Sequence, residues 1–413
     1  MLYLVMSYWR AVCRFCALDS INLILDLGSL SVSGVFRSDG EEVDKFEVAL
    51  GFCNSCQLVQ LMHSYDLSKV FTDSYGYESG INSSMSEHLI KKAQLLQKTY
   101  KITSGIAVDI ASNDGTLLKG YTGLKTVGID PSIPFVTNRY PLDSVRIPEY
   151  FSSSLYFDYF TEKAEIVTSN SVLYDLDNPL TFAQEISNIL KEDGVWHFEQ
   201  SYLPTMITNL SFDTICHEHL LYLTLSNIEH LLEYCGMQII DAELNHINGG
   251  SIAVTAIKTN RTVVPDQRVL NLRKIEQTML VNFRIMLENF ANSVESHIAK
   301  IKDLLLDYRQ KGFKIYGLGA STKGNILIQA LKLPRGFIEG IGDINPKKFG
   351  LHTPGSNIPI IPEEKIYSSK VKALAIVLPW HFKQSILEKS YSYIANGNLL
   401  LFPLPEMEII NKK

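Results

Sequence analysis

The sequence predicts an α/β fold behind a small metal-binding module, and three observations lead to this prediction. Four of the six cysteines form two CxxC pairs within the first 56 residues. From residue 106 onward, short apolar segments alternate with helical ones, and a second series of the same kind begins at residue 313. Strands that alternate with helices are typical of parallel sheets. We therefore expect two α/β lobes after the N-terminal module.

The composition bounds the size and class of the protein. A chain of 413 residues is too long for one core, and roughly 150 residues per domain predicts two or three domains. The net charge of −6 argues against nucleic acid as a partner, because phosphate binding needs a basic face. No apolar run reaches the roughly 18–20 residues of a membrane span, and the N-terminus lacks the basic segment of a signal peptide. We expect a cytoplasmic protein with no membrane partner.

The cysteine pairs predict a structural zinc site. Cys13 and Cys16 form one CxxC pair, and Cys53 and Cys56 form the other. Each pair can turn two thiolates toward one ion, so that two pairs complete a tetrahedral site with four thiolate ligands. No histidine is close enough in sequence to form a catalytic ligand set, which favours a structural ion. The alternative is four unrelated reduced thiols.

The first α/β crossover is predicted over residues 106–130. A strand over 106–110 leads into a turn of small polar residues and a helix that begins near Thr116, and a second strand ends on Asp130. In a doubly wound sheet, the ligand lies at the carboxyl ends of the strands. Asp130 is therefore placed to accept hydrogen bonds from the hydroxyls of a ribose. Upstream, residues 84–98 have helical periodicity, and we expect Tyr75 and Tyr77 ahead of them to line the entrance of the site.

The loop between these strands departs from the GxGxxG fingerprint of dinucleotide sites. Ala111 stands in place of a glycine, and Asn113 and Asp114 stand where a pyrophosphate needs bare backbone. A carboxylate there suits a cationic cofactor without phosphate, such as S-adenosylmethionine. The alternative is an ordinary turn capped by Asn and Asp. The residues predicted to bind this cofactor are Tyr75, Asp109, Ala111, Asn113, Asp114, Gly115, Asp130, Pro131, Ser132 and Asn170.

Further strands are expected at residues 165–168, 195–199 and 252–256, with an amphipathic helix over 181–191. Between them, residues 211–219 form the densest titratable cluster and end in His217-Glu218-His219. An extended segment would place both histidines on one side and the glutamate opposite. The cluster could be a metal pair, a base with an orienting carboxylate, or a structural loop. Metal is the weakest interpretation, because the histidines lack i, i+4 spacing; the other two are equal on spacing alone.

A long helical stretch over residues 270–310 is expected to connect the lobes. A strand over 313–316 then leads into a glycine-bearing loop and a helix over 326–331, and later strands are expected at 340–343, 371–378 and 398–402. An anion could bind at this loop, because a helix N-terminus and Lys323 both favour negative charge. The loop reads GLGAST and lacks the third glycine of the dinucleotide fingerprint.

A series of motifs along the whole chain resembles the sugar C-methyltransferases. In order, they are CRFC…CNSC, SYGYESGINSS, VDIASNDGTLL, GIDPS, FDTICHEHL, INGGS, YGLGASTKGN, GDINPKKFG, PGSNIPI and LPWHF. Enzymes of this family use S-adenosylmethionine to methylate C3 of nucleotide-linked 4-keto-deoxysugars. The resemblance implies a zinc-binding domain over 1–75, a Rossmann-like class I methyltransferase domain over 76–265, and a Rossmann-like C-terminal domain over 266–413 that contributes to nucleotide-sugar binding.

The resemblance also implies roles for individual residues. It makes His219 the general base, with Glu218 in support and Tyr77 approaching the sugar. The substrate-binding residues that it implies are His217, Asn248, Ser321 and Lys323. Two positions depart from the family pattern: Cys216 replaces a tyrosine, and Tyr174-Asp175 stands where the family has a histidine. These departures leave the identity of the sugar and the methylated carbon open.

The expected chemistry is proton abstraction beside a ketone by a neutral imidazole, followed by methyl transfer. A well-placed general base contributes roughly 10²–10⁴-fold to the rate. Two rival functions stay open at this point. One is a zinc-containing protein that binds nucleotide sugars without methyltransferase activity, and the other is an NAD-dependent oxidoreductase that uses the C-terminal glycine loop. We expect a monomer.

Overall fold

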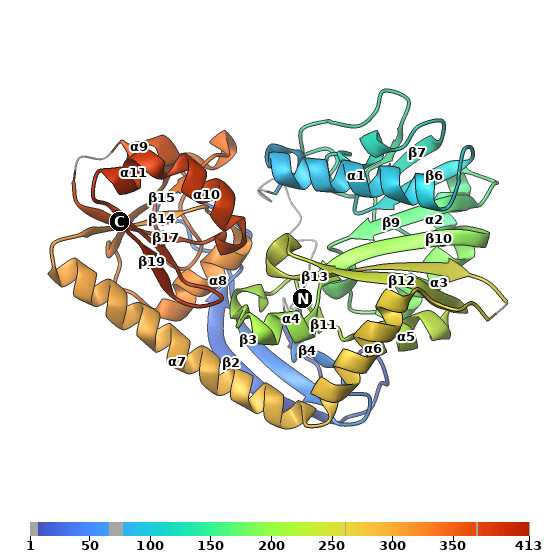
Figure 1. The fold of residues 1–413 in the computed structure, drawn as a ribbon, viewed down its shortest axis with the longest axis horizontal. Coiled ribbons are helices and arrows are strands. Elements are labelled where there is room, and N and C mark those ends of the chain that lie inside the picture. Colours follow the sequence, from blue (N-terminus) through green and yellow to red (C-terminus); the bar gives the residue numbers. More distant parts are fainter. Residues whose placement is uncertain (1–6, 66–76, 261, 369–370, 413) are drawn as a thin grey trace, which may run out of the picture.

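The structure is a computed structural model that describes residues 7–65, 77–260, 262–368 and 371–412. It contains two α/β lobes that are joined by the long helix α7 (Phe283–Gln310), with an N-terminal sheet lying beside both (Figure 1). α7 follows α6 (Gln267–Leu280), and a short break at Val281 and Asn282 separates them. The predicted helical connector over 270–310 is therefore two helices.

The N-terminal sheet is completed by a strand from the central lobe. Its order is β11-β4-β3-β2, and all neighbouring strands are antiparallel. β2 (Ile21–Ser31) and β3 (Lys45–Cys53) form a long hairpin, and β4 (Val59–Leu61) follows β3. β11 (Leu221–Tyr222) comes directly after the histidine cluster. This pairing fixes the cluster against the N-terminal module.

The central sheet has the order β12-β13-β10-β9-β6-β7-β8, in which β13 runs antiparallel to β10 and to β12. Its strands are β6 (Ile106–Ile110), β7 (Lys125–Ile129), β8 (Val145–Ile147), β9 (Ala164–Asn170), β10 (Leu190–Ser201), β12 (Met237–Asn245) and β13 (Ser251–Lys258). The helices of this lobe are α1 (Ser83–Thr99), α2 (Ser153–Tyr159), α3 (Pro179–Ile189), α4 (Leu203–Thr208) and α5 (Leu225–Tyr234). The strands expected at 165–168, 195–199 and 252–256 are confirmed.

Both faces of the central sheet are buried, as the apolar runs of its parallel strands require. On one face, Ala107 and Ile166 belong to the same apolar cluster as Met85 and Leu89 of α1. On the other face, the neighbouring strand residues belong to the larger core that includes α3. The helix predicted over 84–98 is thus α1, and its apolar stripe covers the sheet.

The predicted helix after Thr116 is reduced to one turn of 3-10 helix, η3 (Leu117–Gly120). α1 occupies the sheet face where a crossover helix would lie, and it packs closely on this turn: a side chain at Gly120 would come within 2.4 Å of the Ile90 carbonyl oxygen. The helix that covers β6 therefore precedes the strand in sequence instead of following it.

The C-terminal lobe contains a six-stranded sheet of order β16-β15-β14-β17-β18-β19, parallel except for β19. Its strands are β14 (Lys314–Leu318), β15 (Ile338–Asp343), β16 (Ile360–Pro362), β17 (Ala373–Val377), β18 (Leu399–Phe402) and β19 (Glu408–Ile410). Its helices are α8 (Thr322–Leu331), α9 (Glu363–Tyr367), α10 (Lys383–Lys389) and α11 (Tyr391–Ala395). The second α/β lobe is therefore confirmed.

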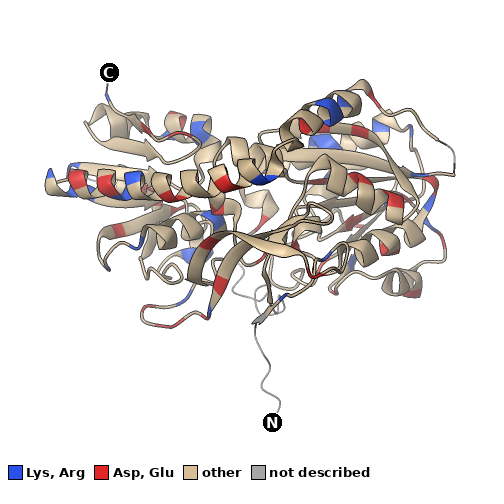
Figure 2. Cartoon of the chain, turned by 90° about the horizontal axis from the view of Figure 1, so that it is seen from below, with Lys and Arg blue, Asp and Glu red and all other residues tan. Residues whose placement is uncertain are grey.

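No helix in the described ranges is both long enough and apolar enough to cross a bilayer. α7 has the length, but charged residues recur along it, and Figure 2 shows acidic and basic residues spread along the helices and loops of both lobes.

Hydrogen bonds from α8 attach the C-terminal lobe to the N-terminal hairpin. The Asn325 side chain is fully buried and donates to the Ser33 carbonyl oxygen at 2.7 Å. One turn later, Gln329 accepts from the Ser31 backbone N–H at 2.8 Å and donates to its carbonyl oxygen at 3.0 Å. The backbone of the N-terminal module is therefore hydrogen-bonded to both lobes: to the central lobe through β11 and to the C-terminal lobe through the side chains of α8.

We predict that Asn325→Leu lowers the free energy of unfolding by about 1–3 kcal/mol, because it leaves the buried Ser33 carbonyl oxygen without a donor. Urea denaturation followed by circular dichroism measures this loss. Asn271→Leu on α6 is the matched control, since Asn271 is exposed and the change should stay within about 0.5 kcal/mol. Equal losses in the two variants would contradict the role of this bond.

Candidate active site

A cavity of about 450 Å³ lies at the carboxyl ends of the central strands, and residues of all three parts of the chain line it. This is the edge where an open α/β sheet binds its ligand. Gly34 and Phe36 reach it from the N-terminal module, and the loops after β14 and β17 close it from the C-terminal lobe. The predicted site residues that line it are Tyr77, Asp109, Ala111, Asn113, Asp130, Pro131, Ser132, Asn170, Glu218, His219, Asn248, Ser321 and Lys323.

Asp130 joins the two loops that follow β6 and β7. One carboxylate oxygen accepts from the Asn113 backbone N–H at 2.8 Å, and the other accepts from the Ser132 N–H at 2.6 Å. Ala111 and Asn113 have φ of 57° and 48°, so the loop turns sharply beneath Asp130. A carboxylate oxygen has room for a second hydrogen bond. Asp130 can therefore shape the loops and still accept bonds from a ribose.

Asp114 and Gly115 lie behind the cavity wall and do not line it. Asp114 is fully buried and pairs with Arg139 at 2.9 Å, and it also accepts from the Gly80 backbone N–H at 2.7 Å. Gly115 packs against the ring of Tyr140, which a side chain would meet at 2.3 Å. The structure therefore gives Asp114 and Gly115 a role in the shape of the loop. Because Asp114 is paired with Arg139, its carboxylate is not available to a cationic cofactor, and the part of the cofactor prediction that rested on its charge is not supported.

Acidic residues lie near the carboxyl ends of three strands at the cavity, β6, β7 and β10. Asp109 accepts from the Thr168 hydroxyl at 2.6 Å, and burial raises the pKa of Asp109 to about 7. Glu199, at the end of β10, binds His88 of α1 at 2.9 Å and accepts from the Asn245 side chain at 2.9 Å. The sequence reasoning did not place Glu199 or His88 in the site. The rule that selected Asp130, an acidic residue at a strand end, would also have found Glu199.

Aromatic side chains form much of the remaining wall. Those from the central lobe are Tyr150, Phe151, Tyr174 and Phe182, and Phe382 comes from the C-terminal lobe. Tyr150 and Phe151 follow β8, the strand beside β7 at the end of the central sheet. These residues were missed because no spacing pattern separates them from ordinary loop aromatics. Tyr75 lies outside the described residues.

The His-Glu-His segment is a turn, and the expectation that both histidines face one side is wrong. The His219 backbone N–H donates to the Cys216 carbonyl oxygen at 3.1 Å, which closes the turn. His217 points into the N-terminal module and lies 3.1 Å from the Leu30 carbonyl oxygen. Glu218 and His219 instead line the cavity. His217 is fully buried outside the cavity, so the predicted contact with substrate is not supported.

Phe46 and Tyr65 complete the pocket of His217. Its ring meets theirs edge-on, with centroids 6.2 Å and 5.1 Å apart. Burial lowers the pKa of His217 to about 4, so the ring is neutral. The His217 side chain packs against two aromatic rings and makes one hydrogen bond, to the Leu30 carbonyl oxygen. It holds the turn that presents the two residues after it.

His219 is held as a neutral base. Its Nδ1 lies 2.8 Å from the Thr214 carbonyl oxygen, which can only accept, so Nδ1 carries the hydrogen and Nε2 keeps its lone pair. The ring packs on Tyr174 with centroids 4.2 Å apart. Burial and the charge of Lys323 lower the pKa of His219 to about 3. The imidazole can therefore accept a proton at neutral pH.

The N-terminus of α8 brings a buried lysine to the same cavity. Ser321 caps the helix by accepting from the Gly324 N–H at 3.1 Å. The Lys323 ammonium donates to the Asn248 carbonyl oxygen at 2.6 Å. Burial lowers the pKa of Lys323, and the nearby Asp213 opposes this shift. The sequence-predicted residues Ser321, Lys323 and Asn248 thus meet at one wall.

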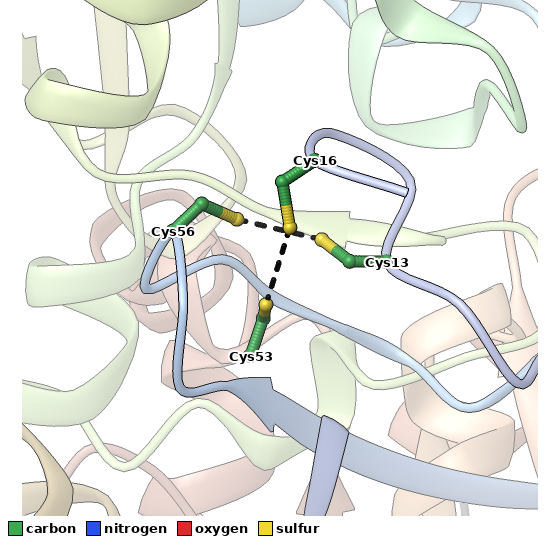
Figure 3. A group of neighbouring side chains, drawn as sticks. All are labelled: Cys13, Cys16, Cys53 and Cys56. Atoms are coloured by element: carbon green, nitrogen blue, oxygen red, sulfur yellow. Dashed lines mark hydrogen bonds between the residues drawn. The ribbon is translucent and has the colours of Figure 1, made fainter. Parts of the chain in front are cut away.

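The four cysteines of the CxxC pairs converge, as predicted (Figure 3). Their sulfur atoms all lie within 4.8 Å of one another, with 3.4 Å between Cys13 and Cys56 and 3.6 Å between Cys16 and Cys53. Four thiolates around a zinc ion, each about 2.3 Å from it, lie about 3.7 Å apart. The cluster fits a tetrahedral zinc with four thiolate ligands and no open position.

We predict one zinc ion per chain, lost in Cys53→Ser. Removing a thiolate opens the tetrahedral site, and the melting temperature should fall because this site ties the two CxxC turns together. Plasma emission spectrometry on protein purified without chelator measures the zinc. Cys235→Ser, which removes a buried thiol elsewhere, should keep it. A wild-type protein without zinc would contradict the assignment.

We predict that His219 does not protonate between pH 8 and pH 5. Its pKa of about 3 lies below this window, so the imidazole stays neutral throughout. Nuclear magnetic resonance of protein with labelled histidine follows each ring, and His219→Asn assigns the signal. A short histidine-containing peptide in the sample reports an ordinary titration with a pKa of about 6.5. A His219 signal that moves with it would refute the neutral base.

Three family models match successive regions of the chain. Family models match residues 13–71 ("Putative zinc binding domain"), 82–242 ("Methyltransferase domain") and 246–405 ("C-methyltransferase C-terminal domain"). C-methyltransferase NovU of Streptomyces niveus is 26% identical over 409 residues, which cover 97% of this chain and 96% of NovU.

Among solved structures, the mitomycin 7-O-methyltransferase MmcR is 18% identical, with 43% of this chain and 56% of that chain covered at a TM-score of 0.33. The magnesium protoporphyrin IX methyltransferase ChlM of Synechocystis PCC 6803, with bound S-adenosylmethionine, is 11% identical, with 42% of this chain and 81% of ChlM covered at a TM-score of 0.32.

The three family models together span nearly the whole chain. The chain belongs to the S-adenosylmethionine-dependent C-methyltransferases that combine a zinc-binding domain, a methyltransferase domain and a C-terminal domain.

Proposed function

We propose that this enzyme methylates C3 of a nucleotide-linked 4-keto-deoxysugar in the biosynthesis of a branched-chain deoxysugar, with His219 as the general base. The observation that supports this most is the neutral imidazole of His219 in a cavity that the cofactor loops and the C-terminal lobe share. C-methylation requires a base at the carbon, because a C–H bond must be broken before the methyl group is received. The motif resemblance adds the sugar and the ketone.

The cofactor end of the cavity fits S-adenosylmethionine. Asp130 would hold the ribose, and Asp109 and Asn170 would face the amino acid part, since a carboxylate and an amide oxygen suit an ammonium group. The Asn170 side-chain oxygen is buried and has no hydrogen-bond partner among the described residues, so it has room for such a donor. When bound, the cofactor supplies an electrophilic methyl group on a positively charged sulfur.

The opposite wall fits the nucleotide end of the sugar. Ser321 and Lys323 open α8, and Lys348 also lines the cavity. A helix N-terminus with lysines favours a diphosphate.

We assign residues 1–75 to the zinc-binding domain, 76–265 to the methyltransferase domain and 266–413 to the C-terminal domain. The membership of β12 and β13 in the central sheet supports the second boundary. A cytoplasmic monomer stays a prediction.

In the proposed reaction, Nε2 of His219 takes the proton from the carbon beside the ketone. The C–H electron pair forms a carbon–carbon double bond, and the carbonyl oxygen becomes an enolate oxygen. The enolate carbon then receives the methyl group, while Nδ1 of the imidazolium keeps its bond to Thr214. Tyr77, at the mouth of the cavity, would contact the sugar.

We predict that His219→Asn lowers hydrogen exchange at the acidic carbon roughly 10²–10⁴-fold, the usual contribution of a general base. The enzyme would be incubated in deuterium oxide with S-adenosylhomocysteine and a nucleotide-linked 4-keto-deoxysugar, so that proton removal is seen without methylation. Proton magnetic resonance of the sugar measures the exchange.

His381→Asn is the matched control for this experiment. His381 lines the same cavity from the C-terminal lobe, and burial lowers its pKa to about 3 as well. It is therefore the rival neutral base. The His381→Asn enzyme should keep most of the wild-type exchange rate. If His381→Asn instead loses exchange and His219→Asn retains it, the base is His381 of the C-terminal lobe.

A further inference from the structure

The segment that carries Tyr77 is fastened to the cofactor loop by its backbone. The Asn113 side chain donates to the Tyr77 carbonyl oxygen at 3.3 Å and accepts from the Ser79 backbone N–H at 3.0 Å. The next residue of the loop, Asp114, accepts from the Gly80 backbone N–H at 2.7 Å. Tyr77 itself is 46% exposed, so the position of its ring depends on the course of this backbone.

Glu78 lies between these anchored residues and joins an ion-pair cluster. Its side chain is 4% exposed, and each of its two oxygens has its own cationic partner. One oxygen accepts from Arg139 at 2.7 Å, and the other accepts from Lys347 at 2.5 Å. Arg139 also donates to Asp114 at 2.9 Å, so two acids face two cations. Burial raises the pKa of the Glu78 carboxyl, but the bonds from Arg139 and Lys347 outweigh it and bring this pKa down to about 2.

The two cations that hold Glu78 come from different lobes. Arg139 lies between β7 and β8 in the central lobe. Lys347 belongs to η7 (Pro346–Lys348), a single 3-10 turn after β15 in the C-terminal lobe. The neighbouring lysine of this turn, Lys348, lines the cavity. Glu78 therefore ties the segment ahead of α1 to the lobe on the other side of the cavity.

The backbone at Glu78 directs the cluster and the cavity-lining side chains to opposite sides. Its φ of −133° and ψ of 125° are extended values, and successive side chains of extended backbone point to opposite faces. Tyr77 and Ser79, on either side of Glu78, both line the cavity. Glu78, Arg139 and Lys347 are not among the described residues that line it. The cluster therefore grips the segment from behind.

This ion pair differs from an ordinary pair on a protein surface. Exposed pairs contribute little, because water screens both charges. Glu78 is buried, so the loss of a partner leaves part of its charge uncompensated. Gly80 brings Arg139 closer still: a side chain there would come within 2.3 Å of the Arg139 Cδ atom. The segment is thus confined by contacts on both of its sides.

We propose that Glu78 is a positioning residue for Tyr77. Arg139 holds it from the central lobe, and Lys347 holds it from the C-terminal lobe. The proposal rests on the proposed function, in which Tyr77 contacts the sugar. Asn113 ties this contact to the cofactor loop, and Lys347 ties it to the lobe that would bind the nucleotide. Tyr77 therefore meets the sugar in one geometry when both ligand sites are in place.

The position of Tyr77 is tested first without substrate, by fluorine magnetic resonance of the zinc-loaded enzyme with S-adenosylhomocysteine. A 3-fluorotyrosine incorporated at position 77 supplies the signal. Lys347→Met removes one cation from Glu78 and should broaden or split this signal, because the ring then takes more than one position. Lys347→Arg keeps the charge and should keep the single signal. If Lys347→Met leaves the shape of the signal unchanged, the proposal is overturned.

Arg335→Met is the matched control, since Arg335 also forms an ion pair between parts of the chain. From the C-terminal lobe it reaches Asp39 of the N-terminal module at 3.1 Å, and both side chains are exposed. Loss of this pair should leave the fluorine signal and the exchange rate as in wild type. Equal effects of Arg335→Met and Lys347→Met would mean that any lost contact between domains disturbs Tyr77, which overturns the specific role of Glu78.

The second test is the exchange experiment with the 4-keto-deoxysugar. A displacement of about 1 Å can cost roughly 10²-fold in rate, so Lys347→Met, which removes one of two cations, should lose roughly 5–50-fold. Lys347→Arg should stay within about twofold of wild type. In enzyme that carries Tyr77→Ala, Lys347→Met should cost less than about twofold more, because the residue it acts through is absent.

Equal losses from Lys347→Met with and without Tyr77→Ala would mean that Lys347 acts elsewhere, which overturns the proposal. If Tyr77→Ala exchanges too slowly for this comparison, the fluorine signal decides. Zinc content and thermal unfolding show that each variant is folded.

The two tests separate this proposal from the proposed function. If wild-type enzyme exchanges no keto-sugar, the proposed function fails, and the fluorine signal still decides whether the cluster holds Tyr77. If wild-type exchange is normal and His219→Asn abolishes it, but Lys347→Met exchanges at the wild-type rate, only the positioning role of Glu78 fails. A broadened signal together with losses that depend on Tyr77 supports both.

Discussion

The burial of His217 in the N-terminal module is the contact on which the active site depends. The ring lies against Phe46 and Tyr65 and reaches the Leu30 carbonyl oxygen. Because residues 216–219 form a tight turn, anchoring this one side chain directs the next two, Glu218 and His219, into the cavity. The N-terminal domain therefore supplies the pocket that sets the direction of the His219 side chain.

The same domain fixes the other two walls of the cavity. Arg14, between Cys13 and Cys16, donates to Asp177 at 3.1 Å, just beyond the turn that carries Asp175. On the opposite side, Asn325 of α8 donates to the Ser33 carbonyl oxygen and so positions the helix that begins with Lys323. His219, the turn at residues 173–175 and Lys323 come from distant parts of the sequence, and the N-terminal domain contacts the segment that carries each of them. A metal-stapled hairpin suits this role, because four thiolate bonds limit its motion.

Sequence reasoning found the features with a local physical signature. The CxxC spacing, the apolar strands and the acidic end of β7 are properties of short segments, and the structure places them as expected. It failed where tertiary contacts decide. Asp114 is paired with Arg139 and lies behind the cavity wall. The helix expected after Thr116 is a single 3-10 turn, because α1 covers that face of the sheet. His217 and His219 point in different directions because their turn packs against the N-terminal module. The spacing of residues in the sequence does not reveal such a contact.

We propose that the methyl group goes to a carbon beside a ketone through proton removal by His219. The decisive experiment is incubation of the enzyme with nucleotide-linked 4-keto-deoxysugars and S-adenosylmethionine bearing a trideuterated methyl group. Tandem mass spectrometry and carbon magnetic resonance then locate the label. We expect a trideuterated methyl group on the ring carbon next to the ketone with wild-type enzyme and none with His219→Asn. Label on an oxygen or nitrogen, or equal incorporation by His219→Asn, would contradict it.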